Sequence, residues 1–140
     1  MDMKLEVSVV PVSDVDRAKR FYEKLGFRLD IDYVANEDYR VIQFTPPGSE
    51  ASIVFGKGIT SAQPGSIDRL VLAVYDIDAA HGELLSHGVE VSEVFHEGAP
   101  GARFHEPGRT AGPAPDRSTY GSFAVFSDPD GNVIGLTDGK

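Results

Sequence analysis

The pattern of hydrophobic and polar positions occurs twice along the chain. In each copy, an apolar run ends at an aspartate that can cap a helix, a helical pattern follows, and a glycine closes it. The capping residues are Asp14 and Asp76, which lie 62 positions apart (76 − 14 = 62), and Gly26 and Gly88 have the same spacing. A fixed-period repeat indicates one supersecondary unit that is used twice.

The first copy predicts a strand, a helix and three further strands. A valine-rich run over residues 4–12 lacks glycine and suits a strand. The helix that follows carries its apolar residues on one face: Val15, Ala18, Phe21, Tyr22 and Leu25. Alternating or short apolar runs predict the remaining strands, over residues 27–34, 39–45 and 51–55. The order is therefore β-α-β-β-β.

The second copy repeats this order but is interrupted by a long loop. Its strands are predicted over residues 67–74, 89–95, 122–126 and 133–137, around a helix between Asp76 and Gly88. Residues 97–120, here called the insertion, are rich in proline and glycine and have no hydrophobic period. A structureless loop of 24 residues in a compact domain is usually functional or disordered.

These elements predict an α+β fold. Two tandem βαβββ modules, over residues 1–60 and 66–140, would form a cupped, incompletely closed mixed sheet with the helices outside, in one structural domain. A single module leaves one sheet face uncovered, so the cavity between the two modules is the natural ligand site. We expect the insertion to lie over one mouth of it.

Composition excludes several kinds of partner. The formal net charge is −9, which argues against binding to nucleic acids or to anionic membranes, because both require clusters of Lys and Arg. The chain has no cysteine, so disulfides, thiolate zinc sites and Cys nucleophiles are excluded. The start of the chain has no signal-peptide pattern and no long apolar segment follows, so a cytoplasmic location is expected.

Three motifs resemble those of the vicinal oxygen chelate superfamily, which includes glyoxalase I, bleomycin-resistance proteins and extradiol dioxygenases. They are the stretches Val10 to Ala18, Leu72 to Ala80, and Phe126 to Ile134, the last containing Asp-Pro-Asp-Gly-Asn. Together they span nearly the whole chain. The resemblance implies paired βαβββ modules, a small-molecule ligand and a homodimer, but it says little about chemistry because the superfamily has many functions.

Enzymes of this superfamily hold a divalent metal through a His on the first strand and a Glu on the last strand of each module. The resemblance puts these positions at Val7, Arg69 and Gly135, with the fourth at Val54 or Gly56. None of these side chains can ligate a metal, so we expect a member without metal or other cofactor. A strand register slipped by one residue would instead bring Glu6 and Asp68 inward, which is the alternative route to a metal site.

Arg69 is the most informative candidate site residue. It could grip an acidic or phenolate-bearing ligand, or it could form an internal ion pair. The other candidate ligand contacts, for each of which core packing or solvation is the alternative, are Val7, Gln43, Phe55, His96, Tyr120 and Phe123. The insertion also carries His105, Glu97 and Glu106, which could act as acids, bases or zinc ligands but are expected to be solvated, and arginines that could close over an anion: Arg103, Arg109 and Arg117.

The sequence thus favours a small-molecule binding protein that holds an organic ligand, anionic or aromatic, without a metal. Two alternatives stay open. One is a lyase, isomerase or dioxygenase-like enzyme that uses a metal with unusual ligands or metal-free acid–base chemistry. The other is a structural or regulatory module with a filled core.

Overall fold

The computed structural model describes residues 1–139 and divides the chain into two compact units. Unit 1 consists of Met1–Ile67 together with Asp128–Asn132, and unit 2 consists of Asp68–Ser127 together with the residues from Val133 onward. The division follows the two predicted modules with one difference. The turn between the last two strands of the second copy, Asp128–Asn132, packs with the first unit.

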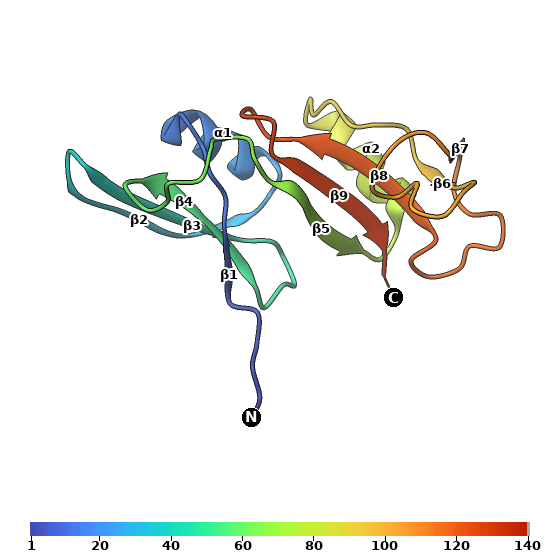
Figure 1. The fold of residues 1–140 in the computed structure, drawn as a ribbon, viewed down its shortest axis with the longest axis horizontal. Helices are drawn as coiled ribbons and strands as arrows, with labels where there is room; N and C mark the ends of the chain where they lie inside the picture. The colour runs from blue at the N-terminus through green and yellow to red at the C-terminus, as the bar shows by residue number, and fades with distance from the viewer. Residues whose placement is uncertain (140) are drawn as a thin grey trace. The chain divides into compact units, whose positions relative to one another are not determined.

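Unit 1 contains a four-stranded mixed sheet and one helix (Figure 1). Its elements are β1 (Val7–Val9), α1 (Val15–Lys24), β2 (Arg28–Asn36), β3 (Tyr39–Thr45) and β4 (Ser52–Lys57). The strand order is β1-β4-β3-β2; β1 runs parallel to β4, and the other neighbours are antiparallel.

The helix α1 begins and ends where the sequence predicts. The Asp14 side chain accepts a hydrogen bond from the Arg17 amide at 3.0 Å, which satisfies one of the free N–H groups of the first turn. Gly26 has φ +87°, the left-handed conformation that ends a helix and that side chains disfavour. The helix buries Tyr22, whose ring lies 5.5 Å from that of Phe55 and 6.2 Å from that of Phe44.

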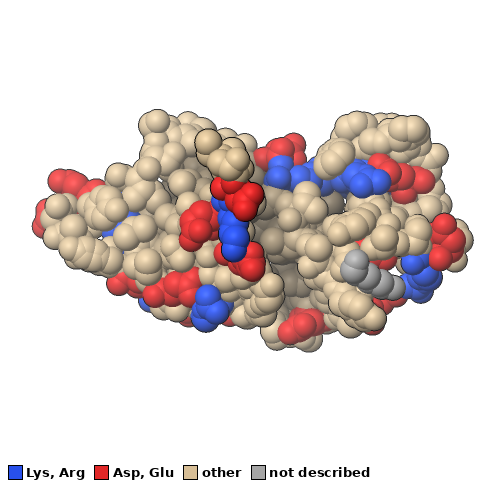
Figure 2. Space-filling view, turned by 90° about the horizontal axis from the view of Figure 1, so that it is seen from below, with Lys and Arg blue, Asp and Glu red and all other residues tan. Residues whose placement is uncertain are grey.

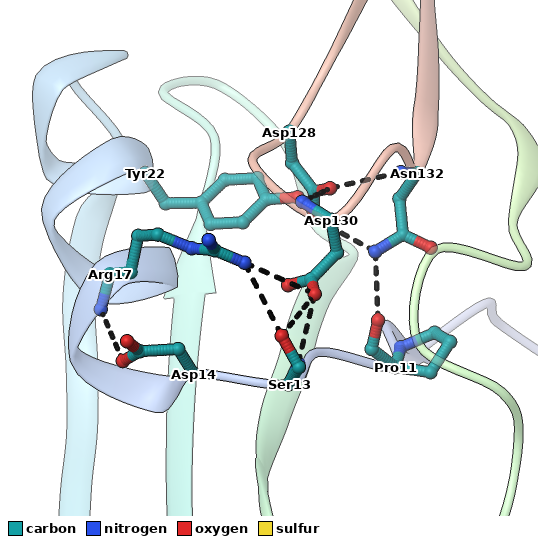
Figure 3. A network of polar contacts seen from close by, with 8 residues as sticks. All are labelled: Pro11, Ser13, Asp14, Arg17, Tyr22, Asp128, Asp130 and Asn132. Atoms are coloured by element: carbon teal, nitrogen blue, oxygen red, sulfur yellow. Dashed lines mark hydrogen bonds and ion pairs between the residues drawn. The ribbon is translucent and has the colours of Figure 1, made fainter.

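The Asp128–Asn132 turn is held against α1 and the end of β1 by buried polar contacts (Figure 3). The Tyr22 hydroxyl donates to Asp128 Oδ2 at 3.0 Å, and Asn132 Nδ2 donates to the Pro11 carbonyl at 2.8 Å. Burial, together with the Asp128 carboxylate, raises the pKa of Tyr22 far above its usual range, so the phenol stays a donor.

Unit 2 repeats this architecture and adds one strand (Figure 1). Its elements are β5 (Asp68–Val74), α2 (Ile77–Ser86), β6 (Phe95–Glu97), β7 (Arg109–Ala111), β8 (Ser122–Ser127) and β9 (Val133–Asp138). The order β5-β9-β8-β6 reproduces the order of unit 1, and β7 extends the sheet beyond β6. The Asp76 side chain caps α2 by accepting from the Ala79 amide at 3.1 Å.

The predicted α+β class and the repeated βαβββ order are confirmed, with two mixed sheets of four and five strands among the described residues. The first strand, predicted over residues 4–12, is wrong in length, because only Val7–Val9 pair as a strand. Its partner β4 starts at Ser52, whose amide donates to the Glu6 carbonyl, so residues further upstream have no strand to pair with.

The strand predicted over residues 89–95 is also wrong. Val91 forms only an isolated bridge with Phe126, and β6 starts at Phe95. The hydroxyl of Ser92 accepts a hydrogen bond from the Val125 amide at 2.9 Å, and a side chain thus replaces the backbone as the partner of that amide. The ladder between this segment and β8 is therefore interrupted.

The insertion contains more regular structure than its composition predicts. Arg109–Ala111 form β7, which pairs antiparallel with β6. The Gly98 amide donates to the Gly108 carbonyl at 2.7 Å, which continues the hairpin beyond the strands. The expectation that residues 97–120 lack regular structure is therefore wrong for this part.

Candidate functional site

A cavity of about 270 Å³ lies on the face of the unit 2 sheet opposite α2, here called the open face. Along β5, every second side chain points to this face, so Arg69, Val71 and Ala73 all line the cavity. From β8 and β9 the same alternation brings in Phe123, Val125, Gly135 and Thr137. The insertion contributes the remaining wall through Arg103, Phe104 and Tyr120.

Arg69 joins the floor of the cavity to the insertion. Its Nη1 donates to the Arg103 carbonyl at 3.0 Å, and its Nη2 donates to the Phe104 carbonyl. The Nε atom lies 3.3 Å from Asp68 Oδ1, and only 10% of the Arg69 side chain is exposed. Nη1 and Nη2 each carry a second N–H group, so the guanidinium has donors besides the two that bind the insertion carbonyls.

The insertion is fixed by a second set of contacts around Glu97. Its carboxylate accepts from the amides of Gly101 and Arg103, both at 3.1 Å, and from the Arg103 guanidinium at 2.8 Å. The Arg103 guanidinium also lies 4.6 Å above the ring of Phe123, which is a cation–π contact. The hydrogen bonds from Arg103 lower the pKa of Glu97 from 4.5 to about 2, so Glu97 is ionised at neutral pH.

Arg109 anchors the insertion on its other side. Its Nε donates to the Ala102 carbonyl at 2.8 Å, and its guanidinium lies 4.3 Å above the ring of Phe95. The rings of Phe95 and Phe123 are neighbours, with centroids 5.8 Å apart. Two arginines of the insertion therefore each cover an aromatic ring of the sheet, and the insertion forms an ordered cover on the open face.

Tyr120 lines the cavity in a backbone conformation that non-glycine residues rarely adopt, with φ +60°. Its amide donates to the Asp138 carbonyl at 2.6 Å, which holds this conformation in place. Its ring lies close above Gly139, where a Cβ would come within 2.8 Å of the ring. Strained residues that line a cavity are often functional.

The cavity differs in charge from the rest of the chain. Its lining includes two arginines and no Asp or Glu among the described residues, whereas the formal net charge is −9. On the face shown in Figure 2, a short row of basic side chains at the upper right is bordered by acidic ones. Each arginine also has a carboxylate partner outside the lining, Asp68 for Arg69 and Glu97 for Arg103, so an anionic group would meet guanidinium donors whose charge is partly offset.

Comparison with known families identifies the chain. Residues 4–136 match the sequence profile of the Glyoxalase/Bleomycin resistance protein/Dioxygenase superfamily. The chain belongs to this superfamily.

Solved structures of the superfamily resemble this chain along its whole length. TnmS3, an antibiotic binding protein from Streptomyces sp. CB03234, is 34% identical with a TM-score of 0.73, covering 99% of this chain and 98% of that chain. A glyoxalase/bleomycin resistance protein from Streptomyces sp. CB03234 is also 34% identical, with a TM-score of 0.70, covering 96% of this chain and 100% of that chain. Among curated proteins, the uncharacterised YetH of Bacillus subtilis (strain 168) is 24% identical over 131 residues, which are 92% of each chain.

The positions that carry metal ligands in superfamily enzymes do not fit a metal here. A Cβ on Gly135 would lie 3.4 Å from Arg69 Cδ, so two of these positions are neighbours on the open face, as the resemblance implies. One is a cation and the other has no side chain. Among residues 1–139, no group of three or more His, Cys, Asp or Glu side chains could hold a metal ion.

The strand registers settle two sequence alternatives. Val71 pairs with Gly135 in unit 2, and in unit 1 Val9 pairs with Val54, so Val54 and not Gly56 is the counterpart of Gly135. The slipped register is wrong, because Glu6 is exposed and the Asp68 side chain is 67% exposed. Of the two alternatives for Arg69, the ion pair is present, with Asp68, beside hydrogen bonds to two insertion carbonyls; a contact with a ligand stays a prediction.

The structure brings Arg69, Tyr120 and Phe123 together in the unit 2 cavity. His96 does not line it; its Nδ1 lies 2.8 Å from the Gly112 carbonyl, beside the insertion. Glu97, expected to be solvated, instead organises the insertion.

The other three candidates, Val7, Gln43 and Phe55, lie in unit 1. Phe55 is fully buried in the aromatic core, so its observed role is packing. Gln43 Nε2 donates to Asp30 Oδ2 at 3.3 Å, and Val7 is 37% exposed. Whether these residues contact a ligand stays a prediction.

Sequence reasoning missed Val71, Phe104 and Thr137 as cavity residues. Val71 and Thr137 could have been found, because they lie two positions from Arg69 and Gly135 on the same strands and must face the same side. Phe104 could not, because no periodicity places a side chain within the insertion. No helix in the described part of the chain is long and apolar enough to cross a membrane.

Proposed function

We propose that the protein binds a small organic ligand, aromatic and carrying an acidic group, in the cavity of unit 2. The observation that carries this proposal is the position of Arg69 on the floor of a cavity whose other strand residues are largely apolar. Ligand pockets commonly combine apolar and aromatic walls with a few polar groups that fix orientation. A guanidinium that retains N–H donors is suited to a carboxylate or phenolate.

The similar proteins support the same class of ligand. TnmS3, which is 34% identical, is described as an antibiotic binding protein. Antibiotics are often aromatic organic molecules, and the rings of Phe104, Tyr120 and Phe123 offer faces on which such a molecule can pack. We therefore propose binding rather than turnover as the function.

We further propose that binding requires no metal. A divalent cation next to Gly135 would meet the positive charge of Arg69, and no ligating side chain stands at either position. Thermal melts in EDTA and in added Mn²⁺, Ni²⁺ or Zn²⁺ should coincide, because a metal that binds the native state would raise the melting temperature. An EDTA-sensitive melt with stoichiometric metal would favour the metal-dependent enzyme instead.

The proposal is tested with two isosteric probes, 2-naphthoate and its neutral amide 2-naphthamide. Calorimetry on the wild-type protein should show tighter binding of 2-naphthoate. Arg69→Met should weaken 2-naphthoate about 10- to 100-fold, the value of a hydrogen bond to a charged group. Arg69→Met also breaks the hydrogen bonds from Arg69 to the insertion, and this lowers the affinity for both probes. The affinity for 2-naphthamide should fall by this common amount only.

Arg28→Met is the matched control, because that arginine lies in unit 1 and its side chain is 72% exposed. It should change neither affinity. An equal loss of both probes in Arg69→Met would mean that Arg69 serves the insertion alone. If neither naphthalene probe nor a panel of aromatic antibiotics binds the wild-type protein, the proposed function fails.

We also propose a homodimer, as the superfamily resemblance implies, and a cytoplasmic location. Exposed apolar side chains on one face of the edge strand β2 support an interface on unit 1: Ile31 and Tyr33. Ile31→Asp should convert a dimer to a monomer in sedimentation experiments, whereas Val34→Asp, also exposed but on the other face of β2, should not. A monomeric wild-type protein would contradict the dimer.

A further inference from the structure

Thr137 carries a hydroxyl group that no part of the described chain satisfies. The residue is 6% exposed, and its Oγ1 is buried without a hydrogen-bond partner. Buried hydroxyl groups in native proteins almost always have a partner, because an unsatisfied one loses its bonds to water and gains nothing in return. Valine has the same shape as threonine and would pack equally well, so packing alone does not require a hydroxyl at this position.

The position of Thr137 relates this hydroxyl to the cavity. Thr137 lies on β9 between Ala73 of β5 and Phe123 of β8, and all three residues line the cavity. A rotation about the Cα–Cβ bond exchanges the hydroxyl and the methyl group, so the side chain can present its oxygen to a molecule in the cavity. The buried polar group therefore belongs to a wall that a ligand would touch.

Thr137 and Arg69 divide the floor of the cavity into polar ends and an apolar middle. The Arg69 side chain lies over Gly135, and Thr137 follows two residues along the same strand, a step of roughly 7 Å. Val71 and Val125, the neighbours of Gly135 in the sheet, supply the apolar surface beside it. A ligand that fits this floor has an acidic group at one end and a neutral polar group further along.

We propose that Thr137 is a specificity-determining residue that hydrogen-bonds a neutral oxygen, a hydroxyl or a carbonyl, placed roughly 7 Å along the ligand from its acidic group. The inference rests on the proposed function and narrows it from aromatic acids to aromatic acids with a second oxygen at the far end. The threonine hydroxyl has one proton to donate, and a hydroxyl or carbonyl oxygen of the ligand can accept it.

The test compares 6-hydroxy-2-naphthoate with 2-naphthoate, which lacks the hydroxyl at the far end. The wild-type protein should bind the hydroxylated probe about tenfold more tightly, and Thr137→Val should abolish this preference while leaving 2-naphthoate unchanged. Thr137→Ser, which keeps the hydroxyl, should retain the preference. The melting temperature of free Thr137→Val should stay level or rise, because the wild-type hydroxyl has no bond to lose.

Thr45→Val is the matched control. Thr45 is a buried threonine of unit 1 whose hydroxyl has partners in Asp30 and Ser52, so its valine variant should melt lower and keep the probe preference. The inference is overturned if Thr137→Val lowers the melting temperature and weakens both probes alike, as a structural residue would. It is also overturned if both probes bind the wild-type protein equally, in which case the proposed function stands; failure of both to bind removes the function as well.

Discussion

The two units share a strand order but differ on their open faces. In unit 1, Val7 and Val9 are 37% and 40% exposed on a sheet that no insertion covers. Their counterparts at the repeat spacing, Arg69 and Val71, line the cavity beneath the insertion in unit 2. The comparison teaches that the repeated sheet supplies a surface, and that the inserted residues turn this surface into a cavity.

The units differ equally on the helix side. Tyr22 of α1 donates a buried hydrogen bond to Asp128, whereas the counterpart of Tyr22 at the repeat spacing is Leu84. The buried contact between helix and turn in unit 1 therefore has no counterpart at the equivalent position of α2. From this contrast we expect the first region to matter chiefly for stability, and the second to recognise the proposed ligand.

Asp128→Ala should have the largest effect. The Asp128 carboxylate accepts hydrogen bonds from Tyr22, from the Asp130 amide, and from the amide and side chain of Asn132, so its loss leaves several buried donors unpaired. We expect the free energy of unfolding to fall by at least about 3 kcal/mol in urea denaturation. Asp2→Ala, at the chain terminus, should stay within about 0.5 kcal/mol of the wild type. If Asp128→Ala lowers the free energy of unfolding by less than about 1 kcal/mol, the contrast drawn between the two units is wrong.

A tryptophan placed at equivalent positions of the two open faces tests where the ligand lies. Val71→Trp should fill the unit 2 cavity and weaken 2-naphthoate by tenfold or more, about 1.4 kcal/mol in calorimetry. Val9→Trp, at the counterpart position, should leave the affinity unchanged. Equal losses in the two variants would place unit 1 in the site as well.

Acid should loosen the insertion before it affects the rest of unit 2. The pKa of Glu97 is lowered to about 2, so the stability that Glu97 contributes is present above its ordinary value of 4.5 and is lost as pH falls from 4.5 towards 2. The NMR signals of the Gly101 and Arg103 amides, which donate to this carboxylate, should titrate with a midpoint near 2. Glu97→Gln should abolish the titration; a midpoint near 4.5 in the wild-type protein would contradict the observed contacts.

Gln43→Ala should have the smallest effect. The Gln43 side chain makes a long, exposed hydrogen bond to Asp30, so its removal should lower stability by no more than about 1 kcal/mol. Affinity for 2-naphthoate should not change if the ligand contacts unit 2 alone. A clear loss of affinity would instead indicate that Gln43 contacts the ligand, and it would contradict the assignment of recognition to unit 2 alone.

Much of the fold followed from the chain itself. Asp14 and Asp76 cap helices where the repeat predicts, and the alternation that makes Val10 buried leaves Val7 and Val9 exposed. Positions 69 and 135, which the resemblance gives as metal-ligand positions in superfamily enzymes, are neighbours in the structure. The strand predictions were wrong at residues 4–6, which have no partner strand, and at Ser92, whose side chain takes the place of a backbone partner.

The sequence determined the repeat, the strand periodicity and the absence of ligating side chains at the metal positions, because these are properties of local order and residue type. Only the tertiary structure decided that Arg69 holds the insertion, that Glu97 organises it, and that the Thr137 hydroxyl lies unpaired in the cavity wall. Loops without periodicity bring such partners together, across 34 residues for Arg69 and Arg103 and within the insertion for Glu97. Their contacts depend on geometry that no spacing along the chain encodes.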